Sequence, residues 1–212
     1  MKYKPKKILI LSSGRAGSST LSTSLKHSIK NVKGYFEPFN PQYGFIKDSE
    51  SMEKHMSEIH QQSSNKIIIS KEIIPSILHH SESVDLLIHR VNSYSKCFDR
   101  IILLARKNQQ KAIESFSYAI LTNKWHDKYS LNNLDTIPKN ILNEAEDRIK
   151  VSNKVLELIS FKMKSPIIYY EDLFSEDKNF KLNFLKIYNL DHLVDKNIFF
   201  KFMDSKNKYR NE

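Results

Sequence analysis

The chain has 212 residues, 40% of them hydrophobic and 27% charged, with one cysteine and a formal net charge of +10. This composition excludes a disordered chain, a disulfide-stabilised fold and a zinc site built on cysteines, and we expect a single domain over residues 1–212. The apolar run at residues 8–11 is too short for a signal peptide or a membrane span, so we expect a soluble, cytoplasmic protein.

The positive charge by itself fits nucleic acid, an anionic membrane surface or a polyanionic small ligand. No arginine-rich helix or basic tract interleaved with aromatic residues stands out. Lys, Asn and Ile are all abundant, which indicates a general bias in composition. We therefore expect no nucleic-acid partner on the basis of charge.

Four short, continuous apolar runs predict strands that are buried on both faces of a parallel sheet. They lie at residues 8–11, 67–69, 101–104 and 167–170. Helical spacing of apolar residues follows the first run at residues 21–29, the third at 112–120, and recurs at about 138–159. This alternation predicts a three-layer α/β fold with a central, mostly parallel sheet flanked by helices.

In such a sheet, ligands bind outside the carboxyl ends of the strands. The residues after the four predicted strands are 12–19, 70–72, 105–107 and 171–172. We expect them to share one edge of the sheet and to form the functional site there. The polar stretch at residues 125–138 is long enough to be a loop on the substrate side.

The first predicted strand runs into a serine- and glycine-rich loop and then a helix. The loop reads Ser12-Ser13-Gly14-Arg15-Ala16-Gly17-Ser18-Ser19-Thr20. Glycines let successive backbone N–H groups and a helix N-terminus point at one anion, so this pattern predicts a phosphate cradle of the P-loop type. With the alternating strands and helices, it predicts a P-loop-type three-layer α/β fold. It lacks the Gly-Lys-Ser/Thr ending of an ATP- or GTP-binding loop, which weakens a kinase interpretation. The alternative is a ligand-free turn in which Ser18 or Ser19 caps the helix.

The loop resembles the 5′-phosphosulfate loop of sulfotransferases that use 3′-phosphoadenosine-5′-phosphosulfate (PAPS), whose carbohydrate branch carries Arg-Ser/Thr-Gly-Ser-Thr. The chain differs at Ala16 and by one extra serine. The resemblance leaves open which hydroxyl of residues 18–20 makes each contact. It implies that the donor is bound by Ser13, Gly14, Arg15, Ala16, Gly17, Ser18, Ser19 and Thr20.

A second motif follows the third predicted strand. Arg106 comes directly after it, and Ser115 lies nine positions later on the next predicted helix. Sulfotransferases hold the 3′-phosphate of PAPS with an arginine and a serine at these places, usually eight positions apart. Lys107 therefore stays an alternative to Arg106, and the pair resembles the double basic pair of the bacterial trehalose sulfotransferase-like branch.

Glu37 is the candidate general base. It lies in Gly34-Tyr35-Phe36-Glu37-Pro38-Phe39, where aromatic neighbours would partly desolvate a carboxylate and raise its pKa. This segment resembles the one that carries the catalytic glutamate of carbohydrate sulfotransferases. The resemblance also implies that Lys71 lies near the sulfuryl group. Tyr170-Glu171-Asp172-Leu173 matches a family motif, in which we expect Glu171 to be structural.

Together these motifs predict a PAPS-dependent sulfotransferase that acts on a hydroxyl of a small, carbohydrate-like acceptor. Arg15, Lys71 and Glu37 are the predicted catalytic residues, and we expect no metal because fixed cations take its place. The alternatives are a P-loop nucleotide kinase and a non-catalytic polyanion-binding protein of the same fold. Further candidates are Trp125 as a ligand-contacting wall, His126 as a second base, and Lys206, Lys208 and Arg210 as nucleotide contacts. The sequence leaves the acceptor and the oligomeric state open.

Overall fold

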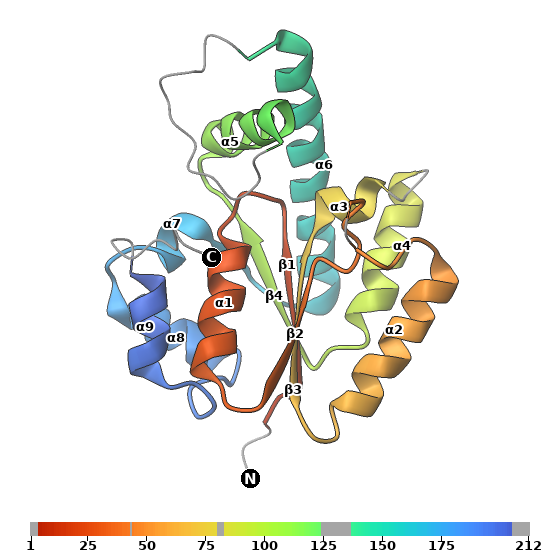
Figure 1. Cartoon of the computed structure of the whole chain (residues 1–212). Helices are drawn as coiled ribbons and strands as arrows, with labels where there is room; N and C mark the ends of the chain where they lie inside the picture. The colour runs from red at the N-terminus through yellow and green to blue at the C-terminus, as the bar shows by residue number, and fades with distance from the viewer. Residues whose placement is uncertain (1–3, 43, 80–82, 124–136, 205–212) are drawn as a thin grey trace.

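The computed structural model describes residues 4–42, 44–79, 83–123 and 137–204. In this part of the chain five strands form one sheet, in the order β2-β3-β1-β4-β5 with every neighbouring pair parallel. The strands are β1 (Lys7–Ser12), β2 (Val32–Phe36), β3 (Ile67–Ile73), β4 (Arg100–Ala105) and β5 (Ile167–Tyr169). Helices flank the sheet (Figure 1), so the predicted three-layer α/β fold of the P-loop type is confirmed.

The helices lie between and after the strands. They are α1 (Ser18–Ser28), α2 (Ser49–Gln62), α3 (Ile74–His79), α4 (Val84–Ser95), α5 (Gln109–Thr122), α6 (Lys139–Met163), α7 (Tyr170–Leu173), α8 (Lys178–Ile187) and α9 (Lys196–Met203). Several of these helices were not predicted. Among them, α2 and α4 begin at side-chain caps: Asp48 accepts from the amide of Ser51, and Ser83 from that of Leu86. No helix in the described ranges is long and apolar enough to cross a membrane.

Alternate residues of β1 separate the two hydrophobic layers. Ile8 and Ile10 pack into a cluster with residues of α1, α8 and α9, while Leu9 and Leu11 pack with residues of α2, α3, α4 and α6. Figure 1 shows α1, α8 and α9 on one side of the sheet and α2 and α4 on the other. Burial on both faces is the reason for the continuous apolar run in this strand.

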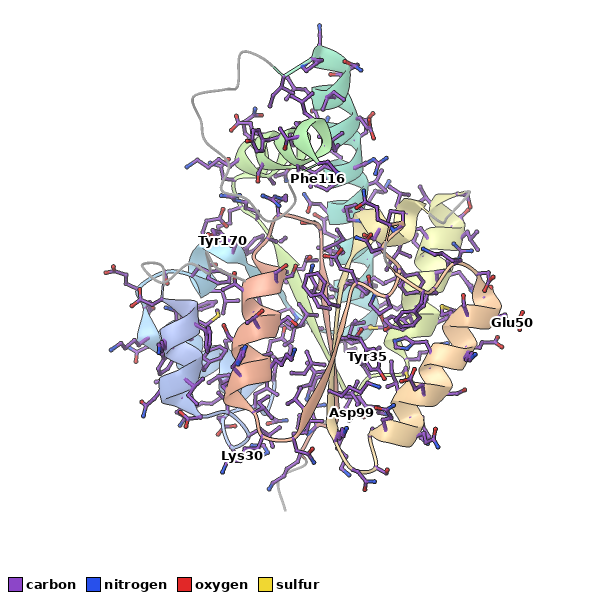
Figure 2. All side chains as sticks on the ribbon, viewed as in Figure 1. Lys30, Tyr35, Glu50, Asp99, Phe116 and Tyr170 are labelled. Atoms are coloured by element: carbon purple, nitrogen blue, oxygen red, sulfur yellow. The ribbon has the colours of Figure 1, made fainter. Side chains whose placement is uncertain are left out.

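Helices α5 and α6 form a third, smaller hydrophobic cluster, which contains Ala112, Phe116, Ala145 and Ile149. Figure 1 shows α5 beyond the carboxyl end of β4, so it lies over the edge where the strands end. In Figure 2, Phe116 of α5 and Tyr170 of α7 lie toward this end of the molecule, and Asp99 and Lys30 lie toward the opposite end. The candidate site is therefore bounded by α5 and α7.

All four predicted strands are present, although the last one ends at Tyr169 and Tyr170 begins helix α7. The sheet differs from the prediction in two further respects. First, β2 was not predicted: it is a short edge strand that contains Lys33 and Gly34, so it shows no apolar run. Second, β3 continues through Ile73, so Lys71 and Glu72 lie inside the strand. Backbone pairing with β1 continues through both charged residues, and pairing with β2 on the other side reaches Lys71.

Candidate functional site

The loop between β1 and α1 has the backbone of an anion cradle. Gly14, Arg15 and Gly17 all have positive φ angles, of 91°, 52° and 76°. Among the described residues, the amides of Gly14, Ala16 and Gly17 donate no hydrogen bond, and α1 begins directly after them, with Gly17 as its N-cap. Unpaired N–H groups ahead of a helix N-terminus are the arrangement that binds phosphate and sulfate groups.

Aromatic rings on two sides fix the path of this loop. A Cβ atom added at Gly14 would meet the ring of Phe116 at 3.5 Å, whereas one added at Gly17 would lie 2.5 Å from Phe174 and 2.8 Å from Tyr170. Gly17 therefore permits both a left-handed backbone and a close approach to the aromatic rings. The loop passes between Phe116 and Tyr170, whose positions Figure 2 marks.

The hydroxyl groups of the loop are not equivalent. Ser18 is buried, and its Oγ accepts a hydrogen bond from Ser12 Oγ at 3.0 Å. Ser13 is also buried, and its amide donates to the carbonyl oxygen of Leu104 on β4. Ser19 and Thr20 are half-buried on the first turn of α1. Ser18 therefore supports the loop, while Ser19 and Thr20 remain accessible to a ligand.

Arg15 projects from the loop toward α5. Its Nε donates a 2.7 Å hydrogen bond to the Oγ of Ser115, which is 6% exposed. Burial lowers the pKa of the Arg15 guanidinium, and the positive charge of nearby Arg106 lowers it further. Two guanidinium groups close enough to repel each other mark a region where an anion would be stabilised.

Arg106 follows β4 and is held over the ring of Tyr170, with 4.9 Å between its Cζ and the ring centroid. Its Nε is buried without a hydrogen-bond partner in the described structure and lies 3.7 Å from Glu171 Oε1. Its neighbour Lys107 is exposed and pairs with Asp172 at 2.6 Å. Of the two basic residues that the sequence left open, Arg106 is the one whose positive charge lowers the pKa of Arg15, after burial.

The sequence placed Arg106 and Ser115 together as one binding pair. The structure brings both next to Arg15, but the hydrogen bond of Ser115 is made to Arg15. A shared role for Arg106 and Ser115 therefore stays a prediction. Glu171 is structural as expected, because its carboxylate accepts hydrogen bonds from the amides of Lys107 at 2.9 Å and Asn108 at 3.1 Å.

Glu37, which directly follows β2, and Lys71, which lies inside β3, form a buried ion pair. Only 2% of Lys71 and 6% of Glu37 are exposed, and Lys71 Nζ donates to Glu37 Oε1. The same ammonium group lies 4.2 Å from the ring centroid of Phe36. Burial lowers the pKa of Lys71, as does Arg15, while Glu37 acts in the opposite direction. The predicted base and two predicted cations therefore belong to one electrostatic cluster.

Two residues of this cluster were not predicted. Asn40 donates from its Nδ2 to Glu37 Oε2 at 2.8 Å, and the fully buried Glu72 accepts from the amide of Phe39 at 3.2 Å. Glu72 carried a signal in the sequence, since it is a carboxylate beside Lys71 at a predicted strand end. Asn40 carried none, because its contact depends on the turn that follows the unpredicted β2.

A small cavity of about 40 Å³ opens beside Arg106, between the ends of β4 and β5 and helix α6. One of its lining atoms, Asn153 Oδ1, is buried without a hydrogen-bond partner in the described structure. The described ranges contain no group of three or more His, Cys, Asp or Glu side chains that could hold a metal ion. Trp125, His126, Lys206, Lys208 and Arg210 lie outside the described residues.

No protein-family model and no curated protein sequence matches the chain. A search of solved structures finds a de novo designed protein described as a P-loop NTPase fold, solved by solution NMR. The match has 14% sequence identity and a TM-score of 0.26, and it covers 76% of this chain and 97% of the designed one.

Proposed function

We propose that the chain is a sulfotransferase that moves a sulfuryl group from PAPS to a hydroxyl of a small, carbohydrate-like acceptor. One observation carries the proposal. Arg15, Arg106 and Lys71 lie close together beside the unpaired amides of the loop between β1 and α1, which we call the phosphate loop. Each of these cations is buried or partly buried near another cation, which costs free energy that a polyanionic ligand would offset. A cytoplasmic location stays a prediction.

In this proposal, the phosphate loop and the cations bind different parts of PAPS. Residues 14–20 bind the 5′-phosphosulfate through backbone N–H groups, and Arg106 binds the 3′-phosphate. Arg15 and Lys71 stabilise the negative charge that builds on the sulfuryl oxygens and on the departing bridge oxygen. The loop, Arg106, Arg15 and Lys71 thus bind the donor and stabilise charge, and none of them transfers a proton.

Glu37 supplies the proton chemistry. Its carboxylate accepts the proton of the acceptor hydroxyl while the hydroxyl oxygen forms a bond to sulfur. The bond between sulfur and the bridge oxygen of the 5′-phosphate breaks, and 3′,5′-ADP leaves with that oxygen. Glu37 suits this role because it lies in the same cluster as Lys71 and Arg15, at the edge where the strands end.

Transfer of radiolabelled sulfate from PAPS to panels of sugars, lipids and phenols tests the proposal directly. We expect labelled product with a sugar acceptor. The P-loop kinase alternative predicts magnesium-dependent ATP turnover instead. Binding of polyanions that weakens steeply with salt, without preference among nucleotides, would support the non-catalytic alternative.

The 3′-phosphate site provides a binding test that needs no acceptor. A hydrogen bond to a charged group contributes about 1.5–3 kcal/mol, so 3′,5′-ADP should bind roughly ten-fold or more tightly than 5′-AMP. Arg106→Ala should remove most of this preference and leave 5′-AMP affinity nearly unchanged. Calorimetric titration of both nucleotides measures both effects.

Lys107→Ala is the matched control, because Lys107 is the neighbouring base but pairs with Asp172 at the surface. We expect it to keep the preference for 3′,5′-ADP. If the wild-type protein does not prefer 3′,5′-ADP over 5′-AMP, the sulfotransferase proposal fails. If Lys107→Ala, rather than Arg106→Ala, loses the preference, the 3′-phosphate contact belongs to Lys107.

A further inference from the structure

Glu72 is a buried carboxyl group that the proposed reaction does not use. It is the neighbour of Lys71 in β3, and its side chain is 0% exposed. Lys71 pairs with Ile10 and Glu72 with Leu11 across β1 and β3, and these two β1 residues pack on opposite faces of the sheet. Lys71 therefore points toward the α1 layer, and Glu72 toward the layer of α2 and α4.

The segment that carries Glu37 crosses the end of β3 from one face to the other. Glu37 contacts Lys71 on the first face, and Phe39 packs edge-on against Tyr94 of α4 on the second, with 5.2 Å between ring centroids. To make this crossing Glu37 adopts a left-handed conformation, with a φ angle of 47°. A non-glycine residue keeps such a conformation only where surrounding contacts hold it.

Three backbone amides in residues 37–40 donate hydrogen bonds that hold this crossing. The amide of Glu37 donates to the carbonyl oxygen of Lys71 at 2.7 Å, and the amide of Asn40 donates to the carbonyl oxygen of Glu37 at 2.9 Å. The third runs from the amide of Phe39 to Oε1 of Glu72. This bond joins the turn to a side chain on the second face of the sheet, two residues beyond Glu37, where the ring of Phe39 also packs against Tyr94.

The environment of Glu72 favours its neutral form. Burial raises its pKa well above the ordinary value, and the carboxylate of Glu37 raises it further, while the amides of Phe39 and Ile73 and the charge of Lys71 act in the opposite direction. Its second oxygen, Oε2, has no hydrogen-bond partner in the described structure. A neutral carboxyl can still accept the Phe39 hydrogen bond through Oε1, so its contact does not require a charge.

We propose that Glu72 is a positioning residue: by accepting the Phe39 amide, it fixes the residue 37–40 turn and so the direction of the Glu37 carboxylate. Calling Glu37 the base rests on the proposed function, but the structural link between Glu72 and Glu37 does not. Glu72 touches no reacting atom in this scheme. Its loss should misdirect Glu37 without altering the phosphate loop, which belongs to a different strand connection.

Two substitutions separate the hydrogen bond from the charge. Glu72→Gln has nearly the same shape, keeps an oxygen that can accept from the Phe39 amide, and cannot carry a charge. We therefore expect its kcat to stay within about two-fold of wild type. Glu72→Leu keeps the volume but removes the acceptor, so we expect kcat to fall about 10–100-fold, since small misplacements of a catalytic group have effects of this size. Affinity for 3′,5′-ADP should be unchanged in both.

Equal turnover by Glu72→Leu and wild type would overturn the proposal, as would a parallel loss of kcat and 3′,5′-ADP affinity. If Glu72→Leu does not fold, Glu72→Asp gives the same test, because its shorter side chain draws the acceptor away from Phe39. Failure of Glu72→Gln to preserve kcat would show that the charge of Glu72 matters and would contradict a role through the hydrogen bond alone.

Crystal structures of the variants keep this test independent of sulfuryl transfer. In Glu72→Leu, or in Glu72→Asp if the leucine variant does not fold, we expect the Phe39 amide to shift and Glu37 to leave Lys71. In Glu72→Gln both contacts should remain. An unmoved Glu37 in the variant without the acceptor would contradict the proposal. Absence of any transfer by the wild-type protein would instead count against the proposed function alone.

Discussion

At the scale of single residues, the candidate site depends on the buried pair of Lys71 and Glu37. An ion pair taken out of water loses hydration that its own attraction barely offsets, so it is weak support for stability. Here the pair is further coupled to Arg15, whose charge lowers the pKa of Lys71. A buried pair with an additional cation beside it is better explained by ligand binding and chemistry than by stability.

Glu37→Gln tests the role of this residue. Gln keeps a hydrogen-bond acceptor for Lys71 but cannot take a proton, so turnover should fall about 10²–10⁴-fold while 3′,5′-ADP affinity is kept. Steady-state kinetics and calorimetry measure the two quantities. Glu144→Gln, which changes an exposed carboxylate on α6, is the control and should be unaffected. Wild-type turnover in Glu37→Gln would exclude Glu37 as the base.

At the scale of elements, the phosphate loop is shaped by its neighbours as much as by its own residues. Gly17 ends the loop with a left-handed backbone and lies against Tyr170 and Phe174, which stack on each other with 4.7 Å between centroids. These aromatic residues belong to α7 and the residue after it, far along the chain. The loop conformation therefore depends on the docking of a segment about 150 residues away.

Gly17→Ala should break this fit. The new Cβ would lie 2.5 Å from the ring of Phe174 in a backbone conformation that alanine disfavours, so we expect a loss of about 2–4 kcal/mol in the free energy of unfolding. Urea denaturation measures it. We also expect weaker binding of 3′,5′-ADP, because the loop must shift.

Gly34→Ala is the matched control for this substitution. Gly34 lies in β2 without a positive φ, and its added Cβ would come closest to Lys26, at an ordinary 3.5 Å. Stability should stay within about 1 kcal/mol of wild type. If both substitutions lower the free energy of unfolding equally, the close approach of Phe174 and Tyr170 is not the reason for glycine at position 17.

At the scale of the whole molecule, the layer between the sheet and helices α2 and α4 contains a buried polar chain. Ser70 Oγ and His55 Nε2 both contact the hydroxyl of Tyr94, at 2.9 Å and 3.1 Å. Burial lowers the pKa of His55 to about 4, although Glu58 acts in the opposite direction. His55 is therefore neutral in the folded protein at neutral pH, and the polar chain joins α2, α4 and β3.

This depressed pKa predicts a pH dependence of stability. An unfolded histidine binds its proton near pH 6.5, whereas folded His55 binds it only near pH 4, so the unfolded state binds more protons between these values. Stability should fall as pH decreases through this window. The contribution of His55 between pH 7 and pH 4 is about 3 kcal/mol.

Urea denaturation of wild type and His55→Gln across pH 4–7 measures this contribution. Gln at this position can still contact Tyr94 but does not titrate, so its stability should decline less steeply toward pH 4. His60→Gln, which changes an exposed histidine of the same helix, should follow the wild-type slope. If His55→Gln and wild type decline in parallel, His55 does not titrate in this way.

Much of the fold and part of the site followed from sequence patterns. Continuous apolar runs indicated β1, β3, β4 and β5, because strand segments buried on both faces are mostly apolar. The expected parallel order then placed Arg15, Lys71 and Arg106 at one edge of the sheet, since parallel strands end on the same side. These predictions succeeded because local composition reports burial, and parallel topology brings strand ends together.

The tertiary structure decided the contacts that local composition does not record. Strand β2 exists because β3 offers it a backbone edge, and it carries Glu37 to Lys71. The partner of Ser115 is Arg15 because α5 folds back over the loop, and Glu72 reaches Phe39 because the chain crosses the end of β3. Each contact joins residues more than thirty positions apart. Such pairings are set by the fold of the chain. The sequence therefore identified the candidate residues but not the partners that they contact.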